Sequence, residues 1–122
     1  MTILVEDLAS VLQTAGLGTI ATDIFVAHMP DAPDAAIAVI DNGGINNAQT
    51  LGEKHNIQVL VRNPVYVTGA AKADSVFSTL DDSWITLTGG GSGYCRATTL
   101  PLPLGLTSSG LNTWSLNFTV TK

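Results

Sequence analysis

Hydrophobic residues recur along the chain with two different periods, which indicate helices and strands. Residues 3–15 and residues 68–82 each carry an apolar stripe at steps of three and four, the pattern of a helix with one buried side. Thr68 is the expected cap of the second helix. The stripes consist of Leu4, Leu8, Val11, Leu12 and Ala15 in the first helix and Ala73, Val76, Phe77 and Leu80 in the second.

The last segment, residues 113–121, alternates strictly between apolar and polar side chains. Such alternation predicts a strand with one face on a core and the other face polar. The apolar members are Trp114, Leu116, Phe118 and Val120. Shorter apolar segments predict further strands at residues 24–26, 35–41, 57–63, 84–88 and 93–99, and the glycine-rich stretch GGGSG joins the last two.

The order of these elements predicts the fold class. A helix is followed by three strands, a second helix and three more strands. This order indicates an α+β fold: a mostly antiparallel sheet of about six strands with two helices packed on one face. No internal repeat and no linker divides residues 1–122, so a single domain is expected. A domain of this size buries roughly 65% of the surface of its unfolded chain, which is enough for a core without disulfides.

The segment HMPDAPD, residues 28–34, is the strongest candidate for chemistry. The segment contains residue types that are found in catalytic or metal sites, namely His28, Asp31 and Asp34. A metal needs three or four converging ligands, however, and nothing near the only other histidine, His55, repeats the pattern. Prolines restrict the backbone, and aspartates favour turns. The pattern favours a rigid turn over a catalytic or metal-binding cluster.

Two loops leave alternatives open. Residues 42–56 form a long polar segment, which is expected either as an arm between subunits or as a disordered loop. Residues 100–111 place Leu102, Leu104 and Leu106 among prolines and glycines, with no period of a helix or strand. These leucines either contact another protein or fold back onto the core.

Other chemical motifs are weak, and no cofactor or metal is expected. Cys95 lies mid-strand, and its neighbour Arg96 projects to the opposite face, so a packed and inert thiol is expected. The glycine-rich stretch is followed by a strand and lacks the Lys-Ser/Thr pair of a phosphate-binding loop. It is interpreted as a hairpin connection.

Composition narrows the range of partners. Charged residues make up only 12% of the chain, against about 25% in typical domains. The surface is therefore either covered in part by other subunits or simply neutral and rich in Thr, Ser, Asn and Gly. A net charge of −5 without a basic cluster argues against tight nucleic-acid binding, although an acidic surface suits a channel through which DNA slides. No signal peptide and no apolar run of membrane-spanning length is present.

An ordered set of short motifs resembles a family of minor capsid proteins of tailed phages. These motifs are Gly16-Leu17-Gly18, Ile24-Phe25, Met29-Pro30-Asp31-Ala32-Pro33-Asp34, Asp41-Asn42-Gly43-Gly44, IQVLVRNP, LPLPLG and WSLNFTV. Each motif alone is common, but together they cover nearly the whole chain in order. The loop after the Gly-Gly pair departs from the family pattern because it is rich in Asn and Gln.

The resemblance implies a siphophage tail terminator, a structural protein rather than an enzyme. Such proteins form a ring, usually six-fold, at the head-proximal end of the tail tube. There they end tube polymerisation and join the tail to the head. The implied partners are further copies of the chain, the tail-tube protein and head-completion or connector proteins, with genomic DNA passing through the lumen. The implied location is the head–tail junction of the virion, after assembly in the cytoplasm of the bacterial host.

Two other hypotheses stay open at this point: another head–tail connector or tail-tube subunit, and a small enzyme that uses the residues of the proline turn. For the assembly hypotheses, the expected contacts with subunits or partners are His28, Met29, Asp31, Asp34, Leu102, Leu104 and Leu106.

Overall fold

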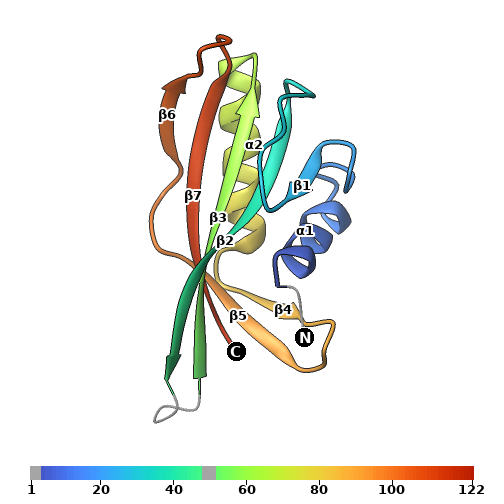
Figure 1. The fold of residues 1–122 in the computed structure, drawn as a ribbon, viewed down its shortest axis with the longest axis vertical. Coiled ribbons are helices and arrows are strands. Elements are labelled where there is room, and N and C mark those ends of the chain that lie inside the picture. Colours follow the sequence, from blue (N-terminus) through green and yellow to red (C-terminus); the bar gives the residue numbers. More distant parts are fainter. Residues whose placement is uncertain (1–3, 48–51) are drawn as a thin grey trace.

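The computed structural model describes residues 4–47 and 52–122 and has the expected α+β architecture (Figure 1). Two helices pack against one strongly curled sheet. The elements in chain order are α1 (Leu4–Thr14), β1 (Ile24–Val26), β2 (Ala36–Asn47), β3 (Gly52–Asn63), α2 (Tyr66–Leu80), β4 (Ser83–Thr86), β5 (Ser92–Ala97), β6 (Leu102–Leu106) and β7 (Asn112–Thr121).

The sheet is mixed rather than purely antiparallel, and it has seven strands where about six were expected. Its order is β1-β2-β3-β7-β5-β4, and β6 also pairs with β7. Among the described strands, β1 and β2 run parallel and the remaining pairs are antiparallel. β7 has β3 along one side, whereas its other side is shared between β6 at its start and β5 at its end.

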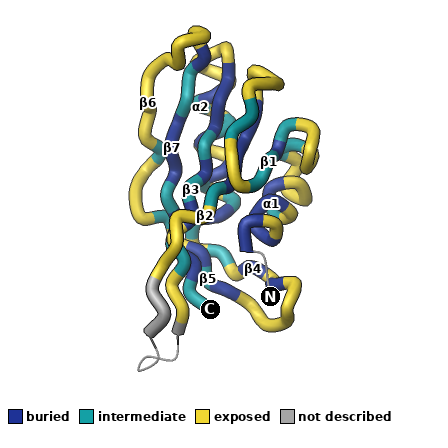
Figure 2. Tube along the Cα trace, in the orientation of Figure 1, coloured by how far each residue is buried: buried dark blue, intermediate teal, exposed yellow. Residues whose placement is uncertain are grey.

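The core lies between the helices and the inner face of β3 and β7. Three cross-strand pairs form its centre: Ile57 with Phe118, Val59 with Leu116 and Val61 with Trp114. All six side chains are buried, as Figure 2 shows for the strands that carry them. Burying one such side chain contributes about 1.5–3 kcal/mol to stability. The alternation predicted for residues 113–121 is therefore confirmed.

The expectation of a polar loop over residues 42–56 is wrong. β2 and β3 continue as an antiparallel pair to Asn47 and Gly52, beyond a bulge between Asp41 and Gly44. We call residues 44–47 and 52–55 the hairpin arm, and Figure 1 shows that it extends past the rest of the sheet. Residues 48–51 lie outside the described part of the chain. The sequence hid this hairpin because backbone pairing between strands does not itself need an apolar pattern.

The expectation of an aperiodic loop over residues 100–111 is also wrong in part. Residues 102–106 form β6, which pairs with β7 through a bulge between Pro103 and Gly105. Proline is tolerated there because β6 has β7 as its single partner strand in the described structure, and the edge of a sheet needs fewer N–H donors. Gly105 has a φ of 86°, which glycine adopts without the cost that a Cβ brings.

The helices agree with the predicted periodicity, but their ends differ. α1 ends one residue earlier than expected, and α2 begins at Tyr66 rather than Thr68. Thr68 is not the cap: Val65 occupies that position without a side-chain cap bond. Instead, the Asn63 side chain accepts a hydrogen bond from the Val65 N–H at 2.9 Å. An asparagine two residues before the cap is a weak sequence signal, which explains the error.

Gly69 provides a test of how closely α2 packs on the sheet. A Cβ at this position would lie 2.2 Å from the Trp114 ring. Alanine normally favours a helix over glycine by roughly 1 kcal/mol. We nevertheless expect Gly69→Ala to lower the free energy of unfolding by about 1–3 kcal/mol, because the indole must move within a packed core. Urea denaturation measures this, with the exposed Thr68→Ala as the control; equal or greater stability of Gly69→Ala would contradict the packing.

Candidate assembly surfaces

The proline turn, residues 28–34, does not form a metal site. His28, Asp31 and Asp34 are exposed and Met29 is half-buried. Among residues 4–47 and 52–122, no group of three or more His, Cys, Asp and Glu side chains is placed to hold a metal ion. The turn therefore presents its polar side chains to the outside, as expected of a corner between strands.

Arg62 fixes the proline turn onto the sheet. Its side chain is almost fully buried, and its Nε donates to the Asp34 carbonyl oxygen at 3.1 Å. Its Nη2 donates to the Pro33 carbonyl oxygen as well. A planar guanidinium with two donors in fixed geometry holds two carbonyls at once. The turn is thus held in place by backbone contacts, while its own polar side chains remain available.

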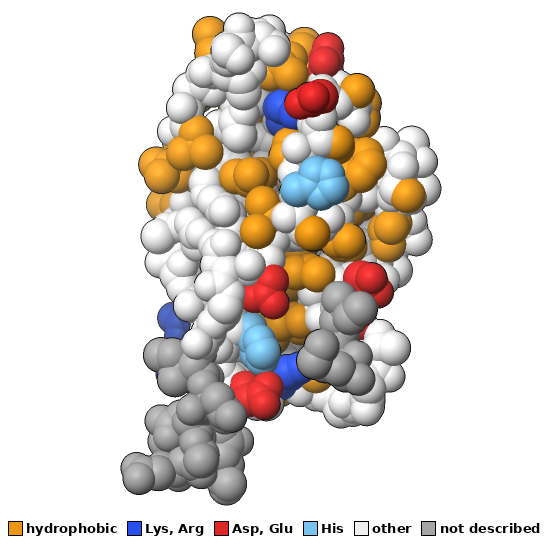
Figure 3. All heavy atoms as spheres, viewed as in Figure 1, with side chains coloured by type: hydrophobic (Ala, Val, Ile, Leu, Met, Phe, Trp, Pro, Cys, Tyr) orange, Lys and Arg blue, Asp and Glu red, His pale blue; other side chains and the backbone are white. Residues whose placement is uncertain are grey.

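The leucines of β6 lie on the surface, so the alternative that they fold back onto the core is wrong. The exposed fractions are 54% for Leu102, 53% for Leu104 and 68% for Leu106, and Leu100 just before the strand reaches 74%. We call these four residues the leucine edge. In Figure 3, hydrophobic side chains gather at the left margin of the molecule, where β6 lies. An exposed apolar edge strand in a soluble chain marks a contact surface or an aggregation site.

The start of α2 extends this apolar surface. Val65, Tyr66 and Val67 are all more than half exposed, and the Tyr66 ring lies 5.3 Å from the Trp114 ring. Asn112, the partner of the last β6 residue, donates from its side chain to the carbonyl oxygens of residues 63 and 64. The end of the leucine edge and the start of α2 are therefore neighbours. A sequence signal was present in the exposed Val67, which lies off the apolar stripe of the helix.

Trp84, on β4, is a further exposed aromatic residue, and it lies away from the leucine edge. It is 72% exposed, and its ring centre lies 5.2 Å from that of Tyr94. The Tyr94 hydroxyl donates to an Asp82 carboxylate oxygen, and this hydrogen bond raises the pKa of Tyr94. The Trp84 ring on β4 packs against the Tyr94 ring on β5, which covers part of the apolar surface of each ring.

A groove of about 520 Å³ opens between α1, the end of α2 and the turn that joins β4 to β5. We call it the α1 groove; its lining residues include Asp7, Ser10, Val11, Thr14, Ala15 and Thr88. Asp7 is only 5% exposed and accepts hydrogen bonds from the backbone N–H and the hydroxyl of Thr88. Sequence reasoning missed this groove because Asp7 and Thr88 are 81 positions apart.

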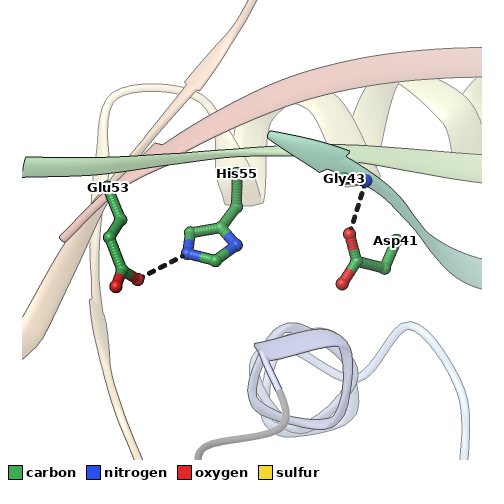
Figure 4. A network of polar contacts seen from close by, with 4 residues as sticks. All are labelled: Asp41, Gly43, Glu53 and His55. Carbon is green, nitrogen blue, oxygen red and sulfur yellow. Dashed lines mark hydrogen bonds and ion pairs between the residues drawn. The ribbon is translucent and has the colours of Figure 1, made fainter. Parts of the chain in front are cut away.

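A small polar network lies at the base of the hairpin arm (Figure 4). The His55 Nε2 and a Glu53 carboxylate oxygen are 3.0 Å apart. Asp41 accepts a hydrogen bond from the Gly43 N–H at 2.8 Å, beside the bulge of β2. In Figure 4 the side chains of all three residues point to the side on which α1 lies. The network fixes the strand geometry where the arm leaves the body of the sheet.

Cys95 is a buried structural thiol, as the sequence indicated. Its side chain is fully buried, whereas Arg96 is exposed. Burial, together with the nearby Asp81 carboxylate, raises the pKa of the Cys95 thiol to about 12. A thiol that stays protonated is a poor nucleophile. In the described part of the chain, neither helix has the length and apolar character needed to cross a membrane.

Comparison with known proteins identifies the family. A family model described as bacteriophage tail terminator protein matches residues 11–122. The chain belongs to this family. The resemblance inferred from the ordered motifs is thereby confirmed, and the tail terminator chain is a structural protein of the phage tail. Among curated proteins, no match is found.

A solved structure supports the fold independently. A chain of the structure titled "Virion of native gene transfer agent (GTA) particle" is similar to the tail terminator chain, with a TM-score of 0.57 and 17% sequence identity. The similarity covers 93% of the tail terminator chain and 82% of the other chain. At this identity, the comparison establishes a shared fold.

The raised pKa of Cys95 predicts a dependence of stability on pH. The Cys95 thiol of the folded chain keeps its proton up to about pH 12. As the pH rises above 9.0, this thiol therefore ionises only in the unfolded chain. Ionisation of Cys95 should therefore leave the free energy of unfolding unchanged below pH 9 and lower it above pH 9. Denaturation from pH 8 to 11 measures this, with Cys95→Val as the control. Equal slopes for the two proteins above pH 9 would contradict it.

Proposed function

We propose that this tail terminator protein closes into a ring at the head-proximal end of the tail tube. Six copies are expected from the resemblance described above. The ring ends tube polymerisation and offers the surface that joins the tail to the head. The observation that supports this most is the family match over residues 11–122, together with an exposed apolar edge that a free monomer does not need.

The leucine edge is proposed as a contact between neighbouring copies. A closed ring uses heterologous contacts, in which one surface of a subunit meets a different surface of the next. The edge offers four exposed leucines and the free side of β6. Covering apolar side chains is favourable by roughly 25 cal/mol for each Å² removed from water. The low charge of the chain is consistent with a subunit that is covered on more than one side.

The proline turn is proposed as a second contact, at the boundary with another subunit or a partner. His28, Met29, Asp31 and Asp34 keep their proposed role because the turn is exposed and held rigidly by Arg62. A rigid surface loses little conformational freedom on binding. The proposed partners are the tail-tube protein and head-completion or connector proteins. Within the ring, a net charge of −5 on each copy lets DNA pass without tight binding.

Deletion of the gene in the phage tests the proposed function directly. Electron microscopy of lysates should show overlong tails of variable length without heads. Tails of normal length that fail to join heads would instead assign the protein to a connector on the head side. The complete absence of tails would point to the tube or its initiation. Either of these last two results would overturn the terminator proposal, which includes no catalytic step.

The leucine edge can be tested separately from the fold. In the triple variant Leu102→Thr, Leu104→Thr and Leu106→Thr, threonine keeps a high β-propensity at exposed positions, so stability should change by less than about 1 kcal/mol. Ring formation and complementation of the deleted phage should be lost. Trp84→Thr, which removes an even more exposed apolar side chain on β4, is the control. A triple variant that assembles as well as the wild type would show that the edge is not a contact.

A further inference from the structure

Among residues 4–47 and 52–122, no cation pairs with the buried carboxylate of the α1 groove. Asp7 is held by the hydroxyl and the N–H of Thr88, the latter at 3.4 Å. Over residues 4–47 and 52–122, the ion pair between His55 and Glu53 is the only one formed, so Asp7 has no charged partner there. A buried charge is costly unless it is paired. Asp7 therefore lines the groove as a buried carboxylate that has only neutral partners among the described residues.

The lining of the groove fits one kind of side chain. Val11, Ala15 and Leu87 supply apolar surface, while the hydroxyls of Ser10, Thr14, Thr79, Thr86 and Thr88 supply hydrogen-bond acceptors. Lysine has an apolar four-carbon stem and an ammonium group with three donors. Such a side chain covers the apolar surface with its stem and brings its charge to Asp7. The site thus favours a lysine over a neutral or acidic group.

Two of the five cationic residues of the chain are already engaged. Arg62 holds the proline turn, and the Lys72 Nζ donates to the Leu17 carbonyl oxygen at 3.0 Å. The other three, Lys54, Arg96 and Lys122, lie at the end of the sheet near the hairpin arm. Lys54 pairs with Thr121 and Arg96 with Thr119, residues that alternate with the buried side chains of β7. The side chains of Lys54 and Arg96 therefore point away from the helices.

Lys54 and the α1 groove lie on opposite sides of the chain, so a contact between them requires two copies. The groove lies beside α1 on the inner side of the sheet, whereas Lys54 is on the hairpin arm with its side chain on the outer face. In Figure 1, β6 and the hairpin arm lie along the left of the molecule, and α1 lies along the right. One lateral side thus carries the leucine edge and Lys54, and the opposite side carries the groove. Contacts between opposite sides are the heterologous kind that closes a ring.

We propose that Lys54 of one copy enters the α1 groove of the next copy and pairs with Asp7. This rests on the ring proposed above and names one of its contacts. Lys54 is preferred to Arg96 because the arm extends past the body of the sheet, so its side chain reaches a neighbour without overlap of the two bodies. The contact supplies the missing cation of the groove.

Disulfide crosslinking tests this contact. In a variant with Lys54→Cys and Ser10→Cys, mild oxidation of assembled protein, either as purified rings or on isolated tails, should give a reducible ladder from dimer to closed ring on a denaturing gel. Ser10 is exposed at the groove, and native Cys95 is buried. The matched control is Arg96→Cys with Ser10→Cys, which should give no ladder. A crosslink within single chains, no ladder, or an equal ladder from the control would overturn the proposal.

Charge variants separate this proposal from the proposed function. Lys54→Glu and Asp7→Asn, which keeps a carbonyl acceptor for Thr88, should each weaken ring assembly about tenfold or more, because one partner of a buried pair is lost. Arg96→Glu makes the same charge change and should have little effect. If Lys54→Glu assembles like Arg96→Glu while deletion of the gene gives overlong tails, only the lysine contact is wrong. If the wild type forms no ring and tails end normally without it, the proposed function itself fails.

Discussion

The pairing of β3 with β7 is the interaction on which the rest of the fold depends. The two strands keep continuous register from Lys54 opposite Thr121 to Asn63 opposite Asn112. Their inner face carries apolar pairs that α2 covers, while α1 packs on β1, β2 and α2. The strands β2, β5 and β6 pair along their two edges. A strand pair anchored by a buried face cannot slip, because a shift of one residue would turn the apolar side chains outward. The exposed edges can therefore vary without loss of the core.

The elements that bury a face were predictable from the sequence, and those that do not were missed. The strict alternation after Thr113 and the apolar stripes of both helices are direct consequences of burial. The hairpin arm has no such pattern, and the prolines beside Leu102 and Leu104 concealed the strand period of β6. The leucines were recognised as possible contacts, but the α1 groove was not. The groove is lined by α1, α2 and the β4–β5 turn, which are far apart in the sequence. No local sequence pattern indicates that these segments are neighbours.

The surface divides into sides with different chemistry. The leucine edge continues to the exposed start of α2, so apolar contact is concentrated along one lateral side. The opposite side carries a buried carboxylate in an open groove. The proline turn is fixed from beneath by Arg62. A chain with few charges can use such specific placements, because each exposed apolar group or unpaired charge then distinguishes one orientation of a neighbour from the others.

The central claim is that the exposed side chains of the leucine edge form a contact surface. Hydrogen–deuterium exchange of the free chain and of the chain assembled on tail tubes tests it most directly. The β6 amides whose N–H groups point away from β7 should exchange rapidly in the free chain and become protected on assembly, whereas the amides of β3 should exchange slowly in both states. Unchanged exchange of β6 after assembly would contradict the claim, since the leucine edge would then remain exposed to water in the completed tail.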